Sequence, residues 1–262
     1  MSSLDAHRGL LGASALLFAA SAATTAIWCG SMSAMPGMEM PGGWTMSMTW
    51  MRMPGQSWPG AAAAFLGMWI VMMTAMMLPS LVPMLWRYRD AVTRTSDTRL
   101  ARLTTLAGAG YFTVWTLCGV AAFPAGLGLA EISMRVPAVS RAVPIATGVV
   151  VLLAGALQFT AWKKRQLACC GAAPMRALPA DASTAWRHGL QLGFHCLRCC
   201  AGLTATLLVI GVMDLRAMAF VAAAITAERL TPAGERMARG SGAIVVAAGM
   251  LLIARESGLS FN

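Results

Sequence analysis

The hydrophobic positions of the chain fall into seven runs, separated by short polar and basic stretches. The runs cover residues 10–28, 61–85, 103–123, 143–162, 190–213, 217–227 and 240–253. A helix needs about 20 apolar residues to cross a bilayer core of about 30 Å, and the first five runs reach about that length. The last two are shorter, but arginines at their ends can extend to the interface. The pattern predicts an all-α fold, a polytopic membrane helical bundle of about seven spans.

The first run also has features of a cleaved signal peptide. His7 and Arg8 form a basic flank before it, and small residues follow its apolar centre. The expected number of spans becomes six if this run is removed or if one of the short runs does not cross. Neither a soluble domain nor an internal repeat is visible, so residues 1–262 are expected to form one integral membrane domain.

Composition and charge agree with a membrane protein. Hydrophobic residues make up 58% of the chain and charged residues only 11%. The net charge of +10 resides in short stretches between apolar runs, which indicates topology and not nucleic-acid binding. The positive-inside rule predicts a cytoplasmic N-terminus, with an extracytoplasmic loop at residues 29–60 and a basic cytoplasmic loop at residues 163–188.

The sequence is unusually rich in methionine and cysteine, and these residues are clustered. The first cluster lies in the outer loop. Of the 21 methionines, eight fall between Met32 and Met53, where glycine and proline disfavour a regular helix. Thioethers suit soft Cu(I) and cannot form disulfides, so they remain ligands in an oxidising compartment. The alternative is an adaptable contact surface. The candidate ligands in this loop are Met35, Met38, Met40, Met46 and Met48.

A second methionine cluster occupies the second span. Met72 and Met76 are four residues apart and share a helical stripe, and Met73 and Met77 form the adjacent stripe. Methionine is also an ordinary packing residue in apolar helices. We therefore treat these four thioethers as candidate ligands with a packing alternative.

The sequence HCLRCC, residues 195–200, carries the third cluster. On a helix Cys196 faces Cys199 and Cys200 at i+3 and i+4, and His195 faces Cys199, close enough for two of them to hold one soft ion. Cys199 and Cys200 point about 100° apart, so one ion is not expected to take all three thiolates.

Arg198 lies in the same motif. A charged arginine inside a membrane span is energetically costly, so its charge needs compensation. Neighbouring thiolates would compensate it, and it would in turn favour their ionised form. Alternatively, the helix begins at Cys199 and Arg198 lies at the interface.

A smaller thiol pair, Cys169 and Cys170, lies in the basic inner loop. Adjacent cysteines stay reduced in the cytosol and are candidates for receiving or handing over a metal ion, although they can equally be incidental.

Several of these residues together resemble a bacterial family of predicted metal-binding integral membrane proteins, a domain of unknown function with a C-x-x-C-C motif in a span. The resemblance runs from about Phe65 to the end of the last span. It includes the tryptophan, paired methionines and proline of the second span, Tyr111 and Trp115, the stretch from Ala154 to Lys163, the cysteine motif, and Glu228. The resemblance implies metal binding. His195, Arg198 and Ala201 depart from the family's pattern, and Gln166 stands where members have a further cysteine.

These features predict a protein that binds a soft metal ion, with Cu(I) the best match, and transports or delivers it. Thiolates hold Cu(I) more tightly than thioethers, so the order of ligands favours inward movement. The expected partners are membrane lipid, the metal ion, and a copper chaperone or an oxidase subunit. Two alternatives remain: a copper chaperone for oxidase assembly, and an enzyme, a membrane thiol oxidoreductase with a Cys196–Cys199 redox pair.

Overall fold

Helices make up almost all of the computed structural model, which describes residues 3–33, 37–50, 55–92, 96–171 and 178–256. Within these residues the all-α prediction is confirmed, and the exceptions are a two-stranded hairpin and one 3₁₀ turn between the first two helices. In chain order the elements are α1 (Ser3–Ser33), β1 (Met38–Met40), β2 (Trp44–Met46), η1 (Met48–Trp50), α2 (Trp58–Ala91), α3 (Asp97–Arg135), α4 (Pro137–Leu157), α5 (Ala161–Gly171), α6 (Ala182–Ile210), α7 (Leu215–Leu230) and α8 (Gly234–Glu256).

Six of the described helices, α1, α2, α3, α4, α6 and α8, are long and apolar enough to cross a membrane. The chain is therefore a multi-pass membrane protein. Of the two short runs, the second becomes a full-length span because α8 continues through the polar residues on both sides. The first becomes α7, whose 16 residues give a length of about 24 Å. The expected seven spans are thus six long helices and one shorter one.

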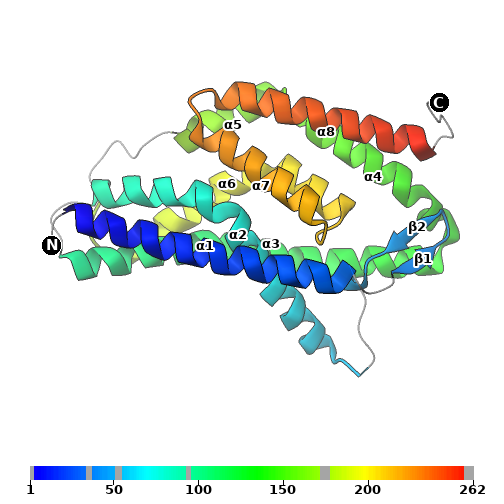
Figure 1. Cartoon of the computed structure of the whole chain (residues 1–262), viewed down its shortest axis with the longest axis horizontal. Coiled ribbons are helices and arrows are strands. Elements are labelled where there is room, and N and C mark those ends of the chain that lie inside the picture. Colours follow the sequence, from blue (N-terminus) through cyan, green and yellow to red (C-terminus); the bar gives the residue numbers. More distant parts are fainter. Residues whose placement is uncertain (1–2, 34–36, 51–54, 93–95, 172–177, 257–262) are drawn as a thin grey trace.

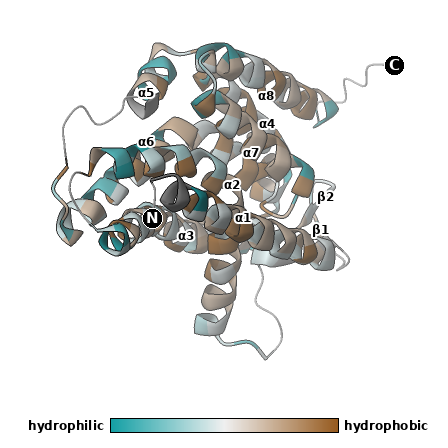
Figure 2. Ribbon diagram, turned by 60° about the vertical axis from the view of Figure 1, so that its left-hand side comes forward, coloured by the Kyte–Doolittle hydropathy of each residue, from teal (hydrophilic) through white to brown (hydrophobic). Residues whose placement is uncertain are grey.

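The helices form a bundle in which α6 is central. It packs against α3 on one side and α4 on the other, and it also contacts α5 and α7. Figure 1 shows α4 and α8 side by side, with α1, α2 and α3 across the bundle from them, and the start of α1 and the end of α8 at opposite ends of the bundle. Figure 2 shows hydrophobic residues along the helices and hydrophilic residues at several of their ends. We call the end that carries β1 and β2 the hairpin end.

Glycines allow α3 and α6 to approach closely. A Cβ atom on Gly193 of α6 would lie 2.9 Å from the carbonyl oxygen of Tyr111 on α3, and a Cβ on Gly189 would collide with the carbonyl of Ala107. Small residues at helix contacts are the usual means of close packing in membranes. This contact brings Tyr111 next to the cysteine motif, which begins two residues after Gly193.

The apolar run at 143–162 does not form one helix. Helix α4 ends at Leu157, and α5 starts at Ala161 after a turn. In this turn the Thr160 hydroxyl accepts a hydrogen bond of 3.3 Å from the Lys163 amide. The break directs Gln158 and Lys163 into the bundle, where both are buried.

The described part of the methionine-rich segment folds onto the bundle. Met38 pairs with Met46 and Met40 with Trp44 in the hairpin. The Trp44 indole Nε1 donates 2.9 Å to the Ser140 carbonyl, and the Ser140 hydroxyl donates 2.7 Å to the Pro41 carbonyl. These bonds attach the hairpin to the start of α4.

Candidate metal centre

The three cysteines of the HCLRCC motif lie on the inner face of α6. Cys196, Cys199 and Cys200 are 0%, 2% and 1% exposed, and all three are free thiols. The Sγ atoms of Cys196 and Cys200, one helical turn apart, are separated by 3.8 Å. The predicted i, i+4 pairing of these two sulfurs is therefore present in the structure.

A thioether completes a group of three sulfurs. The Sδ atom of Met77 on α2 lies 3.9 Å from the Sγ of Cys196, and its side chain is fully buried. Helix α2 is fixed against α3 by the Trp69 indole, which donates 2.8 Å to the Trp115 carbonyl two turns before Met77. We call Cys196, Cys200 and Met77 the sulfur centre.

Two hydrogen-bond donors point at the Cys196 sulfur. The Tyr111 hydroxyl donates over 3.0 Å, and Nη1 of Arg229 donates over 2.7 Å. Arg229 lies in the last turn of α7, and its guanidinium also donates to Ser80 Oγ at 3.1 Å and contacts Met84 Sδ at 2.9 Å, both on α2. A cation and a hydroxyl beside a thiol both favour its ionised, metal-binding form.

A buried ion pair adjoins the sulfur centre. Lys163 Nζ lies 2.6 Å from Glu228 Oε2, with the two side chains 4% and 1% exposed. The same Nζ donates 2.7 Å to the carbonyl of Cys199. Glu228 Oε1 accepts hydrogen bonds from Gln158 at 3.1 Å and from Ser241 at 2.6 Å. This network joins α5, α6, α7 and α8 and holds the residue before Arg229 in place.

His195 and Arg198 lie away from the sulfur centre. Both side chains are exposed on α6. Residues two positions apart on a helix point about 200° apart, so Arg198 faces away from Cys196 when Cys196 is buried. The cation at Cys196 is instead Arg229, which the sequence pattern suggested would extend to the interface. An arginine at the end of an apolar run can turn either way, and tertiary packing decides.

The other three candidate methionines of α2 are buried in the bundle. Met72, Met73 and Met76 are 1%, 0% and 4% exposed and precede Met77 in the hydrophobic core. Along α2 they lie between Met77 and the hairpin end.

The hairpin separates the candidate ligands of the outer segment. Met40 and Met46 are buried and pack with Ala130 of α3, and Met38 is 40% exposed. Met35 lies outside the described residues, as do the side chains of Met48, Cys169 and Cys170.

Among the described residues, no group of three or more His, Cys, Asp or Glu side chains is arranged to hold a metal ion. Two thiols, Cys196 and Cys200, and the thioether of Met77 do converge. Such a set is suited to a soft ion and unsuited to Mg²⁺ or Ca²⁺, which prefer oxygen ligands.

Comparison with models of known families then identifies the chain. Residues 66–252 match the model of PpoB2, described as a copper chaperone. The chain belongs to this copper chaperone family. No curated protein and no solved structure matches the chain.

Membership of the copper chaperone family implies copper binding and a role other than catalysis. It therefore favours copper handling over the thiol oxidoreductase alternative. The matched residues include the sulfur centre, Tyr111, Lys163, Glu228 and Arg229. They exclude α1 and the hairpin, so the methionine-rich segment lies outside the matched region.

Proposed function

We propose that this copper chaperone family member binds Cu(I) at the sulfur centre and passes it on across or within the bacterial inner membrane. The observation that carries the proposal is the spacing of the sulfurs, 3.8 Å from Cys196 to Cys200 and 3.9 Å from Cys196 to Met77. A metal–thiolate bond of about 2.3 Å, the value for zinc, would separate the sulfurs of a trigonal site by about 4 Å. Both distances from Cys196 thus agree with those of a trigonal sulfur site.

Charge balance supports the same ion. Two thiolates and one Cu(I) carry a net charge of −1, which is costly in an apolar bundle unless a cation is close. The Arg229 guanidinium, 2.7 Å from Cys196 Sγ, supplies this charge. A divalent ion with the same ligands would make the centre neutral before Arg229 is counted, so the arginine favours a monovalent ion.

The order of the sulfur ligands along the bundle suggests a direction of copper movement. Thioethers on α2 lie between the hairpin end and the thiols of the sulfur centre, and thiolates hold Cu(I) more tightly than thioethers. With the N-terminus in the cytoplasm, as the positive-inside rule predicts, this order favours inward movement. In this scheme Met35, Met38 and Met48 belong to outer capture, and Cys169 and Cys170 to hand-over. The recipient is a further copper chaperone or an oxidase subunit.

Anaerobic Cu(I) titration of the full-length protein against a competing chelator tests the centre. Cys196→Ser and Cys200→Ser should each lower the Cu(I) affinity by more than about tenfold, because each removes one of three soft ligands. Cys118→Ser is the matched control: it removes a partly buried free thiol of α3 that lies outside the sulfur centre. Unchanged Cu(I) affinity in both serine variants would overturn the proposal.

Alkylation of the resting protein separates this function from the redox alternative. If the protein binds copper, the thiols of Cys196, Cys199 and Cys200 should all react with the alkylating reagent after gentle unfolding without reductant. A Cys196–Cys199 disulfide in the resting protein, together with no bound copper, would instead support a thiol oxidoreductase.

A further inference from the structure

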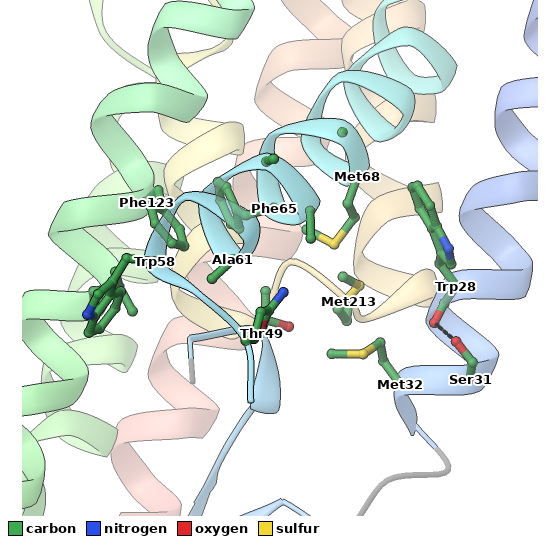
Figure 3. Close-up of a pocket in the computed structure, with 15 residues that line it drawn as sticks. Trp28, Ser31, Met32, Thr49, Trp58, Ala61, Phe65, Met68, Phe123 and Met213 are labelled. Carbon is green, nitrogen blue, oxygen red and sulfur yellow. Dashed lines mark hydrogen bonds between the residues drawn. The ribbon is translucent and has the colours of Figure 1, made fainter. Parts of the chain in front are cut away.

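A cavity of about 360 Å³ lies at the hairpin end, away from the sulfur centre. Its walls come from the last turn of α1, the first turns of α2, the 3₁₀ turn η1, α3, and the link between α6 and α7. Figure 3 shows this arrangement, with Trp28, Trp58, Phe65 and Phe123 among the residues around it. The sulfur centre does not use any of the residues that line the cavity.

Three thioethers converge in this cavity from different elements. Met32 comes from α1, Met68 from α2 and Met213 from the α6–α7 link, and in Figure 3 their side chains extend into the same space. The Cys29 thiol, 2% exposed, lies 3.9 Å from the Sδ atom of Met213. Residues as distant in sequence as Met32 and Met213 therefore line the same cavity. The periodicity of a single helix does not explain this convergence.

The remaining lining determines which ion the cavity suits. None of its described lining residues is charged, and the polar ones, Ser31, Thr49 and Gln56, are few. A hard cation such as Mg²⁺ or Ca²⁺ would find no carboxylate there. A soft monovalent ion needs less compensating charge and prefers thioether sulfur. Aromatic walls reduce its exposure to water.

The cavity is also continuous with the methionines of α2. A smaller hollow beside it is lined by Cys29, Met68, Met72 and Met213, so two α2 methionines one turn apart face this region. Five residues separate Met72 from Met77, a rise of about 7.5 Å along the helix. The cavity and the sulfur centre thus lie at different levels of α2, with methionines of this helix at both places.

We propose that this cavity is a second soft-metal site, in which Met32, Met68 and Met213 bind Cu(I) through thioethers, with Cys29 beside them. It holds the ion before the ion reaches the sulfur centre. The presence of this site does not depend on the proposed role of Cys196 and Cys200, although its place as the first site of a route does.

Ag(I), which mimics Cu(I) and stays monovalent, is the probe for the experiment. The full-length protein in detergent is titrated with Ag(I) in a Cys196→Ser, Cys200→Ser background, which leaves the cavity intact. We expect this background to retain the Ag(I) equivalent of the cavity, in addition to Ag(I) held by Cys169 and Cys170. Adding Met32→Leu, Met68→Leu and Met213→Leu should remove that equivalent, because leucine keeps the bulk and removes the sulfur.

The matched control replaces three exposed methionines, Met134, Met237 and Met250, by leucine in the same background. This control should keep the Ag(I) equivalent. Thioethers need no deprotonation, so binding at the cavity should not change between about pH 5 and pH 8, whereas binding to thiols should weaken at the acid end.

The outcomes separate the two sites. Retention of the equivalent after the three cavity substitutions, or its equal loss in the control, overturns the cavity site. Equal Ag(I) stoichiometry in the wild type and the Cys196→Ser, Cys200→Ser background overturns the sulfur centre and leaves the cavity site standing. X-ray absorption of the retained ion should show sulfur neighbours, and a shell of oxygen neighbours would also overturn the cavity site.

Discussion

Nη1 of Arg229 lies 2.7 Å from the Sγ atom of Cys196, although the two residues are on different helices and 33 positions apart in the chain. This contact places a permanent cation beside the thiol that also touches Cys200 and Met77. The same guanidinium reaches Ser80 on α2, so it connects α7, α6 and α2 at the sulfur centre. A charge at this point would serve copper binding and helix packing together.

The first prediction concerns this arginine. Arg229→Leu should lower the Cu(I) affinity by about 10- to 100-fold, as expected for a group that supports a metal ligand without binding the ion itself. Arg229→Lys should recover part of the loss, because it keeps the charge but not the forked geometry. Competition with a Cu(I) chelator measures both.

Arg198→Leu is the matched control, because it removes an arginine from the exposed face of α6 close to the same cysteines. It should leave the Cu(I) affinity unchanged within about twofold, since the Arg198 side chain points away from Cys196. If Arg198→Leu weakens copper binding as much as Arg229→Leu does, charge compensation by Arg229 alone is wrong.

The second prediction concerns the hydroxyl of Tyr111. Tyr111→Phe keeps the buried ring and removes the 3.0 Å hydrogen bond to Cys196. The loss of a hydrogen bond to a charged sulfur should weaken Cu(I) binding by about 10-fold or somewhat more. Tyr88→Phe serves as the control, because Tyr88 is equally buried on α2 and its hydroxyl makes no hydrogen bond within the described residues. Equal Cu(I) affinities of the two variants would refute a role for the Tyr111 hydroxyl.

The membrane fold is largely predictable from the sequence, because long apolar runs directly report the spans. The ends of the helices are less predictable. Polar residues extend α8 beyond its apolar run, and the run at 143–162 hides the break between α4 and α5, since Phe159, Ala161 and Trp162 continue the apolar pattern through it. That break depends on side-chain bonds made by Gln158 and Thr160, which no periodicity reveals.

The candidate site, too, can be predicted only in part from the sequence. The pairing of Cys196 with Cys200 follows from helical geometry, so the sequence predicts it. The approach of Met77, Tyr111 and Arg229 is a matter of tertiary packing, in particular the close contact at Gly193. Glu228 and Lys163 were visible as charges near apolar runs, but nothing in their spacing indicated that they pair inside the bundle.

The third prediction concerns this buried pair. Glu228→Gln leaves Lys163 charged and uncompensated in the bundle and should lower the free energy of unfolding by about 3–5 kcal/mol. Lys163→Met together with Glu228→Leu should cost less than the single change, because no isolated charge remains. Thermal unfolding in detergent measures both. Glu235→Gln, which removes an exposed partner of Lys164 and Arg239, should change little. A double variant less stable than Glu228→Gln would contradict this account.

The last prediction concerns topology and the role of α7. The six long helices alone would place both ends of the chain on one side of the membrane, whereas a crossing by α7 as well places them on opposite sides. Figure 1 shows the start of α1 and the end of α8 at opposite ends of the bundle, and α7 is about 24 Å long, close to the thickness of the bilayer core. We therefore expect a fluorescent reporter to be active when fused before α1, and a phosphatase reporter to be active when fused after α8. A reporter inserted after Arg94 should report the cytoplasm, and one inserted after Met40 the outside. Activity of the same reporter at both chain ends would show that α7 does not cross. The reverse pattern at Arg94 and Met40 would place the hairpin end inside, and the thioether-to-thiolate order would then favour export of copper.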